Sequence, residues 1–186
     1  MKIIKTKLEG LVVVQPDVFT DQRGYFFESF SEKKYLESGI NARFVQDNIS
    51  KSQKSTIRGL HYQAGEMAQG KLCQVICGKV LDVAVDIRKG SPTYGKYHSE
   101  ILSDENHLQM WIPPGFAHGF SVLSEEAVFM YKCAQFYSKE HERGIRYNDP
   151  VLNIDWQVTD PIISEKDLKS VFFADIRPEF IYEQMD

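Results

Sequence analysis

Hydrophobic positions along this chain follow the period of β-structure more often than the period of helices. The apolar, β-branched run at residues 8–14 ends at Pro16 and predicts a first strand. Residues 31–38 predict one short helix, with Ser31 as its N-cap and Gly39 as its stop. From residue 44 to residue 137, short β-like runs alternate with glycine, proline and polar breaks. This pattern is typical of a β-sandwich or β-barrel.

The clearest strand prediction covers residues 80–87. Its odd positions are apolar, whereas Asp82 and Asp86 occupy even positions, so we expect one core face and one polar face. Gly78-Lys79 lies just before this strand and predicts a hairpin turn after the run 72–77. Further β-like runs cover residues 97–102, 109–112, 119–123 and 127–137. We therefore expect a single all-β domain over residues 1–186, with a few short peripheral helices.

Composition and charge narrow the range of partners. A net charge of −4 gives no general attraction to nucleic acid or to an anionic membrane surface. The apolar runs are shorter than the roughly 18 residues that a membrane helix requires, and the apolar run near the start is too short for a signal peptide. Cys73, Cys77 and Cys133 are odd in number and lie in apolar stretches. We expect a cytoplasmic protein without a disulfide or a zinc site.

His61 is the first candidate for chemistry. It lies in a β-like run three residues after Arg58 and ten before Lys71, so a hairpin could bring all three donors into one cavity. A core rarely gathers this much positive charge unless an anion is bound there. Gly59 keeps the backbone beside Arg58 open to close approach. His61 is thus either a general base beside a phosphate-binding arginine or an ordinary hydrogen-bonded barrel histidine.

His118 is the second histidine that the pattern places near a barrel mouth. It follows the turn formed by residues 113–115 and begins another β-like run. Two histidines in a β-barrel also raise the possibility of a metal site. Such sites usually take two histidines that lie two residues apart on one strand face, but Gln63 and Phe120 occupy the corresponding positions here. We therefore favour chemistry without a metal.

Three further side chains have both a structural and a catalytic interpretation. Tyr131 and Tyr137 lie six residues apart in one β-like run, so in a regular strand they would share a face. Either could pack in the core or act as an acid opposite a histidine base. Asp167 fits the capping box that begins at Ser164, yet it could instead orient His61, as the aspartate of a catalytic triad orients its histidine.

At this point the sequence resembles a known family, the dTDP-4-dehydrorhamnose 3,5-epimerases. The segments that carry the resemblance run in order from about residue 17 to about residue 168. They are Asp21-Gln22-Arg23-Gly24-Tyr25-Phe26-Phe27-Glu28, Phe44-Val45-Gln46-Asp47-Asn48, Arg58-Gly59-Leu60-His61-Tyr62-Gln63, Gln69-Gly70-Lys71, residues 82–88, Ser91-Pro92-Thr93-Tyr94-Gly95, residues 112–120 and Asn148-Asp149-Pro150. An ordered set of this length is far more specific than any one of its motifs.

The resemblance implies a cupin-type jelly-roll barrel and a role for each matching residue. His61 matches the base, Asp167 its partner, Tyr131 the acid and Lys71 the group that stabilises the enolate oxygen. The positions that match the nucleotide and sugar site are Gln46, Asn48, Arg58, Lys71, His118 and Tyr137. Arg23, Phe26 and Glu28 match a segment lent to the neighbouring subunit, which implies a homodimer.

The implied substrate is a dTDP-linked 4-keto-6-deoxy sugar, whose hydrogens at C3 and C5 both lie next to the C4 carbonyl. A histidine base and a lysine beside the developing enolate would suffice to remove them, so we expect no cofactor. Two alternatives stay open. One is an enzyme that inverts a single carbon, or isomerises the ketone, of another nucleotide-linked sugar. The other is a sugar-binding cupin without catalytic activity.

Overall fold

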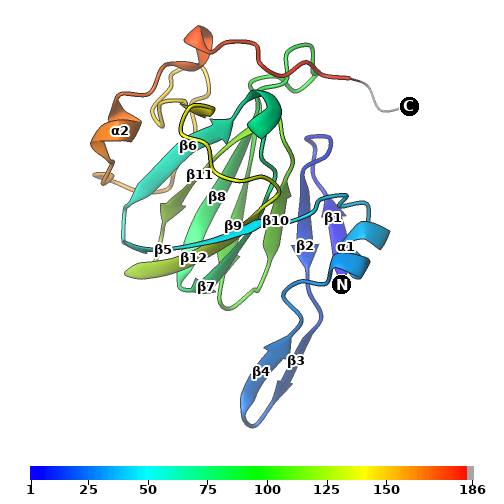
Figure 1. Cartoon of the computed structure of the whole chain (residues 1–186). Helices are drawn as coiled ribbons and strands as arrows, with labels where there is room; N and C mark the ends of the chain where they lie inside the picture. The colour runs from blue at the N-terminus through cyan, green and yellow to red at the C-terminus, as the bar shows by residue number, and fades with distance from the viewer. Residues whose placement is uncertain (184–186) are drawn as a thin grey trace.

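The computed structural model describes residues 1–183, which form two facing β-sheets and a projecting hairpin (Figure 1). The six-stranded sheet has the order β1-β2-β10-β7-β12-β5, and the five-stranded sheet has the order β13-β6-β11-β8-β9. Strands β3 and β4 pair with each other and extend away from the barrel (Figure 1). The all-β prediction is confirmed, and the helices are indeed few and short.

The strands of the six-stranded sheet and of the hairpin are β1 (Lys2–Lys5), β2 (Val12–Gln15), β3 (Val18–Asp21), β4 (Gly24–Phe27), β5 (Gln46–Gln53), β7 (Lys71–Cys77), β10 (Gln109–Ile112) and β12 (Glu126–Cys133). The strands of the five-stranded sheet are β6 (Ile57–Gln63), β8 (Lys79–Asp86), β9 (Tyr97–Ser103), β11 (Phe116–Val122) and β13 (Glu142–Gly144). The helices are α1 (Glu32–Glu37) and α2 (Glu165–Leu168), with 3₁₀ turns η1 (Gly65–Met67) and η2 (Phe173–Asp175). Within the described residues, no helix is long and apolar enough to cross a membrane.

Three apolar clusters hold these layers together. The first fills the space between the two sheets and includes Val80, Phe120 and Phe129. The second lies between the outer face of the five-stranded sheet and the segment that follows β13. The third packs α1 and its flanking loops against the outer face of the six-stranded sheet. Because the C-terminal segment is tied to the sheet in this way, α2 is held beside β6, as Figure 1 shows.

Strand β8 differs from its prediction in an instructive way. Its odd positions do enter a core, but that core is the outer one under the C-terminal segment. Its even positions face the barrel interior, where Val80 and Ala84 pack in the first cluster. Asp82 and Asp86 are completely buried. The face that we expected to be polar, opposite the core face, is therefore buried as well.

The other local predictions have mixed outcomes. The strand predicted at residues 8–14 is β2, which begins at Val12, and an unpredicted strand, β1, precedes it. Helix α1 has Ser31 at its N-cap, although the serine side chain makes no capping hydrogen bond, and Gly39 follows with a positive φ of 86°. The hairpin predicted at Gly78-Lys79 is wrong, because β7 and β8 belong to different sheets. Gly78, with φ of 83°, instead turns the chain from one sheet to the other.

Candidate active site

The strand register places the candidate residues on the inner faces of the two sheets. In the five-stranded sheet, His61 on β6 is the direct antiparallel partner of His118 on β11. In the six-stranded sheet, Tyr131 on β12 is paired with Asn48 on β5 and with Cys73 on β7. Partners in an antiparallel ladder share a face, so each row points in one direction. The two rows face each other across the barrel mouth.

A cavity of about 300 Å³ lies between these rows. Its polar walls include Asn48, Arg58, His61, Lys71, His118, Tyr131, Lys166 and Asp167. A second hollow of about 280 Å³ shares Asn48, His61, Lys71 and Tyr131 and continues to Gln46, Tyr137 and Glu142. Nine of the residues predicted from the sequence thus line one continuous site.

Asp167 contacts the imidazole of His61. The distance between His61 Nε2 and Asp167 Oδ1 is 2.6 Å, and the other carboxylate oxygen accepts a 3.4 Å hydrogen bond from the Gly59 backbone. Only 5% of the Asp167 side chain is exposed, whereas His61 remains 29% exposed toward the cavity. Burial raises the pKa of Asp167, but the hydrogen bond and the charge of His61 outweigh it and leave that pKa lowered. The buried carboxylate therefore stays ionised and orients the ring.

The capping interpretation of Asp167 accounts for its backbone and not for its side chain. Ser164 Oγ accepts a 3.1 Å hydrogen bond from the Asp167 backbone nitrogen and caps helix α2. In a complete capping box, the Asp167 carboxylate would return to the Ser164 backbone. It points to His61 instead. The serine thus fixes the start of a one-turn helix that delivers the carboxylate to the histidine.

Lys71 and Tyr131 lie together on the opposite wall. The Lys71 ammonium nitrogen lies 5.8 Å from the centre of the Tyr131 ring. Burial lowers the pKa of Lys71, because removal from water disfavours the charged ammonium. Burial likewise raises the pKa of Tyr131 to about 12, with smaller contributions from Cys133 and Cys73. The tyrosine is therefore a neutral hydroxyl that can donate a proton.

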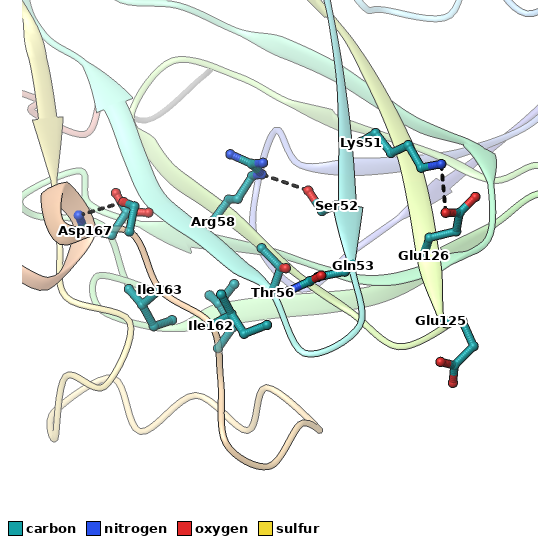
Figure 2. A pocket seen from close by; sticks show the side chains of 12 residues that line it. Lys51, Ser52, Gln53, Thr56, Arg58, Glu125, Glu126, Ile162, Ile163 and Asp167 are labelled. Carbon is teal, nitrogen blue, oxygen red and sulfur yellow. Dashed lines mark hydrogen bonds and ion pairs between the residues drawn. The ribbon is translucent and has the colours of Figure 1, made fainter.

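Arg58 lies at the boundary between this cavity and a neighbouring groove of about 560 Å³. Its Nε donates a 2.9 Å hydrogen bond to Ser52 Oγ, which fixes the guanidinium group. Figure 2 shows Arg58 between Asp167 on one side and the Lys51–Glu126 ion pair on the other. A guanidinium held in this position can meet an anionic group entering from the groove.

Three predicted residues lie away from this cavity. Arg23 and Phe26 are on the projecting hairpin, and Glu28 follows it. The Arg23 guanidinium is paired with Asp21 at 2.6 Å, and Glu28 with Lys34 at 2.9 Å. Phe26 is 70% exposed. The structure therefore does not bring these three residues to the His61 cavity of their own chain.

The prediction for Tyr137 was wrong in its geometry. Strand β12 ends at Cys133, so Tyr137 is not on the same strand face as Tyr131. Tyr137 instead donates a 2.9 Å hydrogen bond to Glu142 on β13, and both residues line the second hollow.

Two site residues escaped the sequence analysis, Glu142 and Lys166, which form a 2.5 Å ion pair at the cavity edge. Lys166 is the immediate neighbour of Asp167, and that adjacency was the available signal.

Asp82 is the hidden partner of the second histidine. Its Oδ1 lies 2.6 Å from His118 Nε2, and both side chains are nearly or completely buried. Burial lowers the pKa of His118, although the Asp82 carboxylate acts in the opposite direction. The lowered pKa favours a neutral imidazole. The sequence showed Asp82 only as the polar face of a strand.

The fold and the cavity together define a class of protein. A jelly-roll barrel of the cupin type holds a histidine with a buried carboxylate on one wall, and a tyrosine with a lysine on the other. This arrangement can remove a proton from one face of a bound ligand and return one to the opposite face. The class is that of enzymes that invert carbon centres by proton transfer.

Comparison with known proteins gives the family. A family model described as dTDP-4-dehydrorhamnose 3,5-epimerase matches residues 5–175. The chain is 53% identical over 176 residues to the dTDP-4-dehydrorhamnose 3,5-epimerase of Shigella flexneri, covering 94% of this chain and 97% of that protein. This chain belongs to the dTDP-4-dehydrorhamnose 3,5-epimerase family, as the resemblance of its motifs had indicated.

Solved structures agree with this assignment. A 3,5-epimerase from Legionella pneumophila in complex with dTDP-4-keto-L-rhamnose is similar at a TM-score of 0.94 and 49% identity, covering 98% of this chain and 99% of that one. A 3′-monoepimerase from Streptomyces bikiniensis in complex with dTDP-quinovose is also similar, at a TM-score of 0.86 but only 27% identity, covering 92% and 87% of the two chains. The fold is thus shared by enzymes that invert two carbons and by one that inverts a single carbon.

Proposed function

We propose that this protein converts dTDP-4-dehydro-6-deoxy-D-glucose to dTDP-4-dehydro-L-rhamnose by inverting C3 and C5. The observation that carries the proposal is the His61–Asp167 pair, which faces Tyr131 and Lys71 across one cavity. The family and the high identity to double epimerases support two inversions in preference to one. The same four groups argue against a sugar-binding protein without activity.

His61 acts as the base that removes the proton next to the carbonyl. Each abstraction converts the imidazole to an imidazolium and leaves an enolate on the sugar. Asp167 fixes the ring and stabilises the imidazolium, because its carboxylate is buried and ionised. The reaction moves protons only and changes no oxidation state, so the proposal assigns no cofactor.

Lys71 stabilises the oxygen of the enolate. A preorganised donor of this kind is worth about 3 kcal/mol in the transition state, because charge develops on an atom that the donor already faces. Tyr131 then returns a proton from the face opposite His61, as its neutral hydroxyl permits. His61 gives up its proton to solvent, and Tyr131 takes one back from solvent, before the second carbon reacts.

Residues at the edge of the cavity bind the nucleotide portion of the substrate. We assign Arg58 to the diphosphate, since its guanidinium borders both the cavity and the groove in Figure 2. Polar contacts to sugar and nucleotide are assigned to Gln46, Asn48, His118 and Tyr137, and also to Glu142 and Lys166 at the same edge.

We further propose a cytoplasmic homodimer in which each subunit lends its β3–β4 hairpin to the partner's site. The exposure of Phe19, Tyr25 and Phe26 on that hairpin supports exchange, because water-exposed aromatic rings gain free energy when a partner covers them. It would also bring Arg23 and Glu28 to a site that they do not reach in their own chain. Three free cysteines fit a reducing compartment. We treat residues 1–186 as one epimerase domain.

Deuterium incorporation tests the reaction. The keto-sugar nucleotide is incubated with the protein in heavy water, and NMR follows label at C3 and C5. We expect label at both carbons and a rhamno-configured product after reduction. Label at one carbon would show a single-site epimerase. No label at either carbon would refute the enzymatic assignment and favour a sugar-binding protein without activity.

Two variants assign the steps. His61→Ala should lose exchange at both carbons. Tyr131→Phe should keep exchange but form little inverted product, because it removes only the hydroxyl of a half-buried ring. Full activity in His61→Ala would end the assignment of the base.

A further inference from the structure

Deep between the two sheets lies a cluster of three side chains from three strands. Cys73 comes from β7, Asp82 from β8 and His118 from β11. The thiol, one carboxylate oxygen and one ring nitrogen all lie within 4.8 Å of one another. The exposed fractions of the three residues are 0%, 0% and 6%. The proposed epimerase reaction uses only His118 directly.

One atom of this cluster is unpaired. Asp82 Oδ1 contacts His118, but among the described residues Asp82 Oδ2 has no hydrogen-bond partner although it is buried. A buried carboxylate oxygen without a partner is costly, and native structures avoid it unless a bound group satisfies it. The free oxygen can therefore accept a further group, and a cation would suit its negative charge.

We propose that Cys73, Asp82 and His118 form a binding site for a divalent cation of the zinc class. A thiolate, an imidazole and a carboxylate are the ligands that such a cation prefers, and three of them leave a fourth position open. His118 also lines the wall of the cavity, which gives the cation an entry path.

The distances fit this site after a small adjustment. Tetrahedral coordination at ordinary zinc bond lengths separates sulfur from nitrogen by roughly 3.5 Å, and Cys73 Sγ lies 3.7 Å from His118 Nε2. The 2.6 Å contact between His118 and Asp82 is too short for two ligands of one cation. That contact must open by roughly 0.7 Å, with the hydrogen bond replaced by two bonds to the metal.

Charge and protons balance on binding. The cation displaces the thiol proton of Cys73, which leaves to solvent, and the Cys73 thiolate with the Asp82 carboxylate then neutralises the double charge. His118 keeps one proton, moved to Nδ1, because Nε2 must bind the metal.

Cobalt(II) is a suitable probe because its bond to a thiolate gives a charge-transfer absorption. Titration of the wild-type protein should show this absorption saturating at one cation per chain. Cys73→Val should abolish it, since valine fills the apolar space without offering a ligand. Cys133→Val is the matched control, because this second buried cysteine lies outside the cluster, and it should keep the absorption.

Absorption that survives in Cys73→Val, or that disappears in Cys133→Val, would overturn the site. X-ray absorption of the cobalt-loaded wild-type protein provides a measurement that needs no variant. It should show one sulfur at about 2.3 Å, and a shell of oxygen and nitrogen alone would refute the proposal.

Binding of a cation to this site should also stop epimerase turnover, a consequence that rests on the proposed epimerase function. A cation on His118 removes that side chain from the substrate. Loaded wild-type protein should lose activity and recover it with a chelator, whereas Cys73→Val should resist the cation. Undiminished turnover by loaded protein would refute the inhibition. The cobalt titration contains no sugar nucleotide, so failure of the epimerase assignment would leave its result intact.

Discussion

Replacement of Asp167 by asparagine tests the central pair of the site. The substitution keeps the size and polarity of a side chain that is only 5% exposed, but it removes the negative charge beside His61. The weakened interaction is a 2.6 Å hydrogen bond to a ring that becomes an imidazolium during the reaction. A hydrogen bond to a charged group is worth about 1.5–3 kcal/mol. Since about 1.4 kcal/mol changes a rate tenfold, kcat should fall roughly 10- to 150-fold.

The assay measures kcat and KM separately for formation of the inverted product. The charge on His61 develops only after proton abstraction, so the loss should appear in kcat while KM changes little. Deuterium exchange at both C3 and C5 should slow in parallel, because the same base serves both carbons in the proposal.

Ser164→Ala is the matched control. Ser164 caps α2 through the Asp167 backbone, and loss of a cap costs about 1 kcal/mol of stability. This variant should unfold more easily but keep most of its kcat, because the Asp167 carboxylate remains. If Asp167→Asn retained more than half of the wild-type kcat, the orienting role would be refuted.

Three other outcomes follow from the structure. Burial lowers the pKa of Lys71 and raises that of Tyr131 to about 12, so kcat/KM should fall with rising pH as Lys71 loses its proton, below the ordinary lysine pKa of 10.5. Tyr131→Phe should leave this alkaline limb of the kcat/KM profile in place. Disappearance of the limb in that variant would contradict its assignment to Lys71. Gly59→Ala should lower the free energy of unfolding by about 3 kcal/mol in a denaturant titration, since the φ of Gly59 is 117° and a Cβ would lie 2.6 Å from the Gly119 backbone. Gly39→Ala is the control: its φ is 86° but the space around it is open, so it should lose only about 1 kcal/mol. Equal losses in the two variants would show that the close packing at Gly59 is unimportant. Phe26→Ala and His61→Ala should each be nearly inactive. When the two variants are coexpressed, half of the dimers should be mixed and each mixed dimer should have one intact site of two, which restores about a quarter of wild-type turnover. No recovery would refute the exchanged hairpin.

The sequence by itself determined the class of the fold and pointed to nine of the residues that line the candidate site. Short β-like runs with glycine and proline breaks predicted an all-β chain, because the alternation of side chains on a strand is a local property. The spacing of Arg58, His61 and Lys71 pointed to one cavity, and the structure brings them together. Even so, local signals misplaced the turn at Gly78. A glycine permits a turn but does not say which sheet the next strand joins.

Only the tertiary structure decided the partners of the two histidines. Asp167 is 106 residues from His61 in the chain, and its local pattern predicted a helix cap just as well. Asp82 appeared to be the exposed side of a strand until the second sheet and the C-terminal segment buried both faces of β8. A sequence pattern reports which face of a strand is apolar. It does not report what the opposite sheet places against the other face, and the position of a charge in three dimensions depends on that packing.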